Sequence, residues 1–132
     1  MTKQISLFLE NKTGRIGQVA RTLGQNGINM KAFSMTETPD FGILRIVVSD
    51  TERAVTVLAD AGFAVSLTDV VCIQCPDHPG SLADVLDRLT EAGISINYMY
   101  AFSEGAAAKF VIRPADLARC EEVLKACGCT IL

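Results

Sequence analysis

The chain has 132 residues, of which 49% are hydrophobic and 20% charged, and it carries a net charge of −3. This balance is typical of a globular protein, and the acidic charge argues against a nucleic-acid surface and against binding to anionic membranes. No apolar run reaches the roughly 18 residues that a membrane helix needs. The first residues lead directly into a strand pattern, so we expect no signal peptide, and the odd number of five cysteines then indicates reduced thiols in a cytoplasmic protein.

The first half of the chain alternates strand and helix patterns. Apolar residues recur every second position in the strands and at i, i+3, i+4 and i+7 in the helices. Ser49 and Glu52 stand at the two places of a capping box, which predicts that Ser49 caps the second helix. The predicted order is a strand at 5–9, a helix at 16–23, strands at 28–35 and 42–48, a helix at 54–61 and a strand at 63–67.

The second half has the same order of patterns. Pro114 suits the first turn of a helix, which predicts a helix from there to residue 126. Between the halves, Thr68-Asp69 forms a very short linker without a Gly, Pro or Ser tract, so the halves are held close. The predicted elements are a strand at 71–75, a helix at 82–89, hairpin strands at 94–102 and 107–112, the helix at 114–126 and a strand at 129–132.

A shift of 66 positions superimposes the chain on itself without a gap. It carries Gly14 onto Gly80, Gly27 onto Gly93, Ile46 onto Ile112, Leu58 onto Leu124 and Gly62 onto Gly128. A repeat of this length is a whole small domain, so we predict two domains, at residues 1–68 and 69–132. The βαββαβ order is the ferredoxin-like arrangement of the α+β class, with two helices on one face of a four-stranded antiparallel sheet.

The loops between the first strand and first helix of each half are candidates for ligand binding. They read Asn11-Lys12-Thr13-Gly14-Arg15 and Asp77-His78-Pro79-Gly80-Ser81. A glycine here lets the backbone approach a ligand, and the helix N-terminus behind it favours a carboxylate. The side-chain oxygens of Asn11 and Asp77 suit either a ligand ammonium group or the capping of the helix.

The pattern Asp-x-Pro-Gly-x-Leu at residues 77–82, followed by a helix and Gly-Ile-x-Ile at 93–96, resembles an ACT domain. The first half matches as Asn-x-x-Gly-x-Ile at 11–16 and Gly-Ile-Asn-Met at 27–30, with Thr13 in place of the usual proline. The resemblance covers nearly the whole chain. Its nearest likeness is a stand-alone tandem ACT protein, a regulatory module of amino-acid metabolism.

The resemblance implies that the two modules pair side by side into an eight-stranded antiparallel sheet with helices on one face. It also implies that an amino acid binds where the loop of one module faces the start of the second strand of its neighbour. The loop set is Asn11, Thr13, Gly14, Arg15, Ile16, Asp77, His78, Gly80, Ser81 and Leu82, and the facing set is Ile28, Asn29, Met30, Ile94, Ser95 and Ile96.

We therefore expect a regulatory protein that binds a free amino acid, acts on a metabolic enzyme and forms a homodimer, with no catalytic residue, cofactor or metal of its own. Arg15 suits either a clamp on the ligand carboxylate or a solvated loop, and His78 either a surface loop or a ligand contact. Two alternatives stay open. One is a metal- or thiol-redox-responsive module using Cys72 and Cys75, and the other is a protein-interaction module without a ligand.

Overall fold

The computed structural model describes residues 2–10, 12–37 and 39–132, and over these residues the chain forms four α-helices and seven β-strands. The strands and helices belong to two compact units. Module 1 is Lys3–Thr68, and module 2 is Asp69–Leu132 together with Thr2, whose hydroxyl lies 3.4 Å from the carbonyl oxygen of Leu132. None of the helices in the described ranges is long and apolar enough to cross a membrane.

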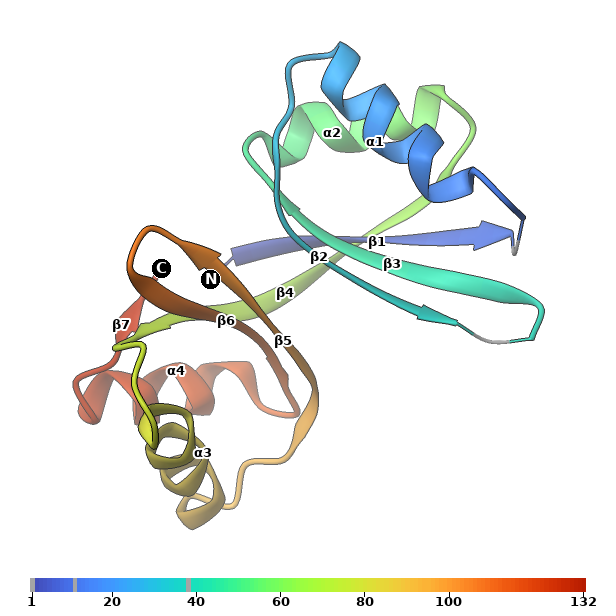
Figure 1. Cartoon of the computed structure of the whole chain (residues 1–132). Coiled ribbons are helices and arrows are strands. Elements are labelled where there is room, and N and C mark those ends of the chain that lie inside the picture. Colours follow the sequence, from blue (N-terminus) through green and yellow to red (C-terminus); the bar gives the residue numbers. More distant parts are fainter. Residues whose placement is uncertain (1, 11, 38) are drawn as a thin grey trace. The chain divides into compact units, whose positions relative to one another are not determined.

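Module 1 is a four-stranded layer with two helices on one face (Figure 1). Its strands lie in the order β2-β3-β1-β4, and β3 is antiparallel to both β1 and β2. The elements are β1 (Thr2–Glu10), α1 (Arg15–Gln25), β2 (Met30–Glu37), β3 (Phe41–Val48), α2 (Thr51–Asp60) and β4 (Ala64–Cys75).

The core of module 1 follows the predicted periods. In β1 every second side chain, at Ile5, Leu7 and Leu9, is at most 1% exposed, and α1 contributes the fully buried Val19 and Leu23. Because the strand alternates with period two and the helix with period 3.6, one apolar face of each element meets the other in a single core.

Module 2 repeats this plan with the strand order β5-β6-β4-β7 and its two helices on one face (Figure 1). β6 is antiparallel to β4 and β5, and the core contains Val71, Ile73, Leu89, Ile112 and Leu124, each at most 1% exposed. Its further elements are α3 (Ser81–Glu91), β5 (Ile96–Glu104), β6 (Ala107–Pro114), α4 (Leu117–Ala126) and β7 (Thr130–Ile131).

The predicted linker at Thr68-Asp69 is wrong, because both residues lie inside strand β4. The last strand expected for module 1 and the first expected for module 2 are one continuous strand of 12 residues, so the described chain has seven strands where eight were expected. The stretch contains three valines, one isoleucine and one threonine, and neither glycine nor proline interrupts it, which favours an extended backbone throughout.

Two helix starts also differ from the prediction. Asp50, not Ser49, caps α2 by accepting a hydrogen bond from the backbone N–H of Arg53, while the Ser49 hydroxyl accepts one from the N–H of Asn29. Pro114 ends β6 instead of starting a helix, and α4 begins after Asp116, whose carboxylate accepts a hydrogen bond from a first-turn N–H. In both places an extended aspartate supplies the acceptor that a helix start needs.

Candidate functional site

The two candidate loops lead into α1 and α3 through glycines in the left-handed region. Gly14 has φ of 88° and Gly80 has φ of 91°, and both are exposed. Among the residues that the structure describes, no side chain caps either helix. The capping interpretation of Asp77 is therefore wrong, while Asn11 lies outside the described residues.

An uncapped helix start carries a partial positive charge and leaves first-turn N–H groups available to a ligand. The N–H groups of Arg15 and Ser81 already donate to the carbonyl oxygens of Lys12 and His78, so the available ones belong to the residues that follow. Helix α1 has no acidic residue in its first turn, whereas α3 has Asp84 there. The start of α1 is thus electrostatically more favourable to a carboxylate than the start of α3.

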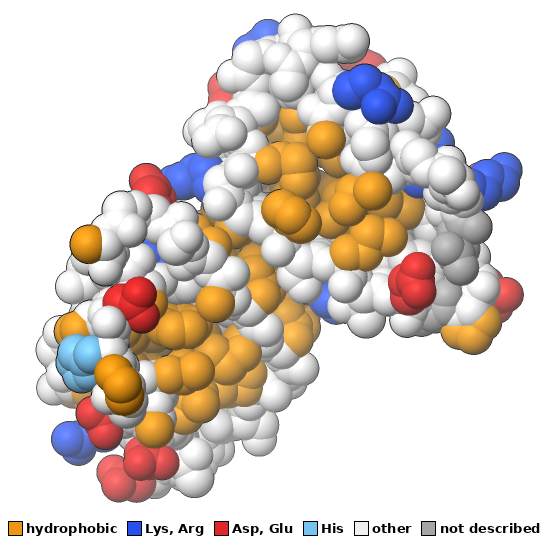
Figure 2. Space-filling view, viewed as in Figure 1, with side chains coloured by type: hydrophobic (Ala, Val, Ile, Leu, Met, Phe, Trp, Pro, Cys, Tyr) orange, Lys and Arg blue, Asp and Glu red, His pale blue; other side chains and the backbone are white. Residues whose placement is uncertain are grey.

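His78 and Ser81 lie together inside the second loop. The Ser81 hydroxyl, in a residue only 9% exposed, is 3.0 Å from His78 Nδ1, and the same ring nitrogen is 3.1 Å from the Pro79 carbonyl oxygen. The histidine itself is at the surface (Figure 2). No hydrogen bond to a carboxylate orients the imidazole within the described part of the chain, so this pair stabilises the loop and lacks the third member of a catalytic triad.

Arg15 does not extend over the first loop. Its Nη1 donates a hydrogen bond of 2.8 Å to Gln18 Oε1, and its Cζ lies 4.9 Å from the centroid of the Phe63 ring. Lys12 in the same loop pairs with Glu10 at 2.7 Å. The hydrogen bond and the charge of Lys12 hold the pKa of Glu10 below its usual value.

The remaining loop residues differ in exposure. Thr13, Ile16 and Asp77 are exposed, and Leu82 is half-buried. The first loop therefore presents a hydroxyl and an apolar side chain, and the second a carboxylate and an apolar side chain, so each combines polar and apolar groups as small-ligand sites do.

Most of the predicted facing residues are buried or half-buried in the core of their own module. The side chains of Ile28 and Ile94 are 4% and 8% exposed and lie in the two cores. Met30 and Ile96 are half-buried against the same cores. Asn29 and Ser95 are the members of this set whose side chains are exposed.

Within one module, the loop and the facing residues are at opposite ends of a helix. Helix α1 has 11 residues and separates Gly14 from Ile28, and α3, also of 11 residues, separates Gly80 from Ile94. At a rise of 1.5 Å per residue, such a helix is about 16 Å long. A site built from both sets therefore requires the loop of one module and the strand start of another.

A cavity of about 380 Å³ adjoins the second loop. It brings His78 and Ser81 together with the turn between α4 and β7, which was not among the candidate site residues predicted from the sequence. Its lining residues are Gln74, Cys75, Pro76, His78, Ser81, Asp84, Val85, Cys127, Gly128, Cys129 and Thr130.

Comparison with known families gives a match over residues 1–127 to the model described as ACT domain pair. The chain belongs to this family. A scan of the curated proteins gave no match. Among solved structures, this ACT pair is similar to protein BT0572 from Bacteroides thetaiotaomicron, with 47% identity and a TM-score of 0.94 over 99% of this chain and 91% of that one.

Two further structures share the fold of this ACT pair. The regulatory subunit of aspartate kinase from Thermus thermophilus, in its ligand-free form, has 18% identity and a TM-score of 0.71 over 96% of this chain and 90% of that one. The corresponding subunit from Thermus flavus has 18% identity and a TM-score of 0.62, with 94% and 88% covered. The fold of this ACT pair is thus one that regulatory subunits use.

The cysteines of the ACT pair do not form a thiol site at Cys72 and Cys75. Both are buried in β4, and only Cys75 belongs to the core of module 2, as expected for strand positions three residues apart. Burial, with a smaller contribution from Cys129, raises the pKa of Cys75 and so disfavours the thiolate that metal binding and redox exchange require. The described residues contain no group of three His, Cys, Asp or Glu placed to hold a metal ion.

Proposed function

We propose that this ACT domain pair binds a free amino acid between two ACT modules and thereby regulates a metabolic enzyme. The observation that carries the proposal is the start of α1 and α3 at exposed glycines with no described side chain capping either helix. The first-turn N–H groups would receive the ligand carboxylate, which pairs a negative group with the positive end of the helix.

The ammonium group of the ligand would be received by Asp77 in the second loop and by Asn11 in the first. Asp77 is exposed and does not cap α3, so its carboxylate is not committed to the helix. Apolar contact would come from Ile16 and Leu82 at the start of each helix, and polar contact from Asn29 and Ser95 of the facing module.

Regulation would follow from where the ligand sits. A ligand that contacts two modules would bind one relative arrangement of them more tightly than another. It would shift the equilibrium between the two arrangements by at most the difference between its binding free energies for them. Two structures with the same fold are regulatory subunits of aspartate kinase, which supports an enzyme as the partner that responds to the shift.

The experiment is thermal unfolding of the purified protein with each of the common amino acids at millimolar concentration. A ligand present at about 100 times its Kd stabilises the folded state by about 2.7 kcal/mol, which raises Tm by several degrees in a protein of this size. We expect one amino acid, or a few related ones, to raise Tm. Equilibrium dialysis with that amino acid then gives the number of sites per chain.

The Asp77→Ala variant should keep its unliganded Tm and lose the ligand-induced shift. Asp116→Ala is the matched control, because Asp116 does cap its helix. This variant should have a lower unliganded Tm and keep the full shift. If no amino acid raises Tm, the sensor proposal fails and the protein is better described as an interaction module without a ligand.

A further inference from the structure

Module 1 has a cavity of about 390 Å³ along one side of α1, which we call groove 1. Its other wall is the turn that follows α2. The lining residues are Arg15, Gln18, Arg21, Thr22, Gln25, Ala61 and Phe63.

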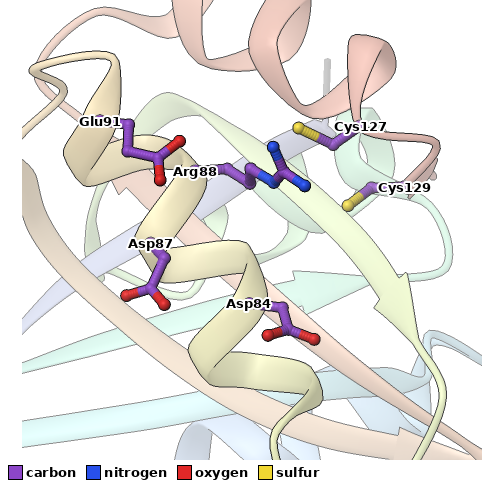
Figure 3. A pocket seen from close by; sticks show the side chains of 6 residues that line it. All are labelled: Asp84, Asp87, Arg88, Glu91, Cys127 and Cys129. Atoms are coloured by element: carbon purple, nitrogen blue, oxygen red, sulfur yellow. The ribbon is translucent and has the colours of Figure 1, made fainter.

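Module 2 has a cavity of about 510 Å³ in the same place along α3, which we call groove 2 (Figure 3). Every residue that lines groove 2 is the repeat counterpart of a residue in groove 1, 66 positions earlier. The pairs are Gln18 and Asp84, Arg21 and Asp87, Thr22 and Arg88, Gln25 and Glu91, Ala61 and Cys127, and Phe63 and Cys129.

The two grooves carry opposite charge. Groove 1 contains Arg15 and Arg21, and α1 has no acidic residue at all. Groove 2 contains three carboxylates and one arginine, all from α3. The same surface of the same fold is therefore basic in one module and acidic in the other.

The guanidinium groups of groove 1 lie along α1. Arg15 stacks on Phe63, and its Nε is buried without a hydrogen-bond partner among the described residues. Arg21 lies back towards the start of the helix, since a Cβ added at Gly17 would be 3.3 Å from Arg21 Nη1. The counterpart of Gly17 is Ala83, so this close approach is specific to module 1.

In groove 2 the carboxylates project from the side of α3. Figure 3 shows Asp84, Asp87 and Glu91 on successive turns of this helix, while Arg88 points towards Cys127 and Cys129. The three acidic residues are all exposed. A helix with cations spaced along one side fits this helix by charge and by the ridges-into-grooves packing of two helices.

We propose that α1 of one copy of this chain packs against α3 of a second copy, so that Arg15 and Arg21 face the carboxylates of groove 2. A second copy of the chain is the partner that fits, because each copy offers the basic groove 1 and the acidic groove 2 that complement each other. In a dimer with two-fold symmetry, α1 of each copy would face α3 of the other, so each charge reversal would act on two equivalent contacts. The inference does not depend on amino-acid binding.

The test is sedimentation velocity of the full chain over a range of concentrations. We expect a monomer–dimer equilibrium that weakens between about 50 mM and about 500 mM salt, because screening acts on exposed charges at these ionic strengths. Arg21→Glu and Asp87→Arg each reverse one charge in both copies of the contact. Each should raise the dimer Kd by at least about tenfold, since like charges then face each other.

The decisive variant combines the two substitutions. In the Arg21→Glu/Asp87→Arg double variant, opposite charges face each other again, so the dimer Kd should return to within a few-fold of the wild-type value. Arg53→Glu on α2 and Glu122→Arg on α4 are matched controls, because they make the same charge changes at exposed positions outside both grooves and should leave the Kd unchanged.

Three results would overturn the proposal. The first is a monomer at every concentration in low salt. The second is a dimer whose Kd does not respond to either single reversal, which would place the interface elsewhere. The third is a double variant as weak as the single ones. Circular dichroism of each variant separates loss of association from loss of folding, and the amino-acid titrations test ligand binding independently.

Discussion

Removing the cap of α4 should destabilise the protein, whereas the analogous change before α3 should not. The carboxylate of Asp116 accepts a hydrogen bond of 3.0 Å from the N–H of Arg119. Replacing an N-cap aspartate by alanine costs about 1 kcal/mol, within a range of about 0.5 to 2. Asp116 is exposed, so no cavity adds to this cost. Asp77→Ala removes no cap and should change stability by less than about 0.5 kcal/mol.

The assay is thermal and urea unfolding of the two variants and of the wild type, each monitored by circular dichroism in the absence of ligand. For a chain of this length, about 1 kcal/mol corresponds to a fall in Tm of about 4 °C. The urea midpoint should fall for Asp116→Ala with an unchanged m-value. Equal losses in the two variants would refute the reasoning, because Asp77 would then stabilise α3 in a way that its geometry does not provide.

Three further predictions concern single residues. Gly80→Ala should destabilise the protein by about 1 to 2 kcal/mol in urea unfolding, because φ of 91° strains any L side chain although the added Cβ meets no atom within 4 Å; an unchanged midpoint would contradict this. Leu89→Ala should cost about 2 to 5 kcal/mol, since this fully packed side chain is 1% exposed; a loss below about 1 kcal/mol would show that the site collapses without a cavity. Burial raises the pKa of the Cys120 thiol from 9.0 to about 11, so the thiol loses its proton at a lower pH in the unfolded chain than in the folded one. The free energy of unfolding should therefore fall as pH rises from 9 to 11. A Cys120→Ala variant should show a smaller fall, and an identical fall would exclude Cys120 as the cause.

The internal repeat and the spacing of apolar residues predicted the fold well, because both can be read from the order of residue types without knowing any tertiary contact. The alternating buried positions of β1 are confirmed, as are Val19 and Leu23 of α1, the ACT family and the α+β class, whereas Ile16 at the start of the predicted helix stripe is exposed. The predictions failed where an element ends: β4 runs on through the expected linker, Pro114 ends a strand instead of starting a helix, and the cap of α2 is a neighbour of the predicted one. Ser49 and Asp50 are both good caps, and only the backbone conformation decides that Asp50 receives the helix N–H.

The candidate site was less accessible to sequence reasoning. The sequence indicated Gly14 and Gly80 as the glycines of the two loops but not their positive φ, and the direction of the Arg15 side chain depends on Phe63, 48 positions later in the chain. The grooves were missed for a similar reason. Their charged and polar lining residues on α1 and α3 look like ordinary solvent-facing helix positions until the repeat and the turns that follow α2 and α4 are considered together. The amino-acid contacts themselves stay a prediction.

The uninterrupted strand β4 restricts how the length of such a chain can vary. Val65 packs against the core of module 1, and Val71 and Ile73 lie in the core of module 2; all three are at odd-numbered positions of the strand. Side chains of a strand alternate between its faces, so an insertion of one residue at Thr68 would exchange the inward and outward positions of everything that follows in the strand. An insertion or deletion of an even number of residues at this boundary therefore keeps the core side chains of both modules on their inward faces. One of an odd number turns those of one module outward unless a β-bulge restores the alternation.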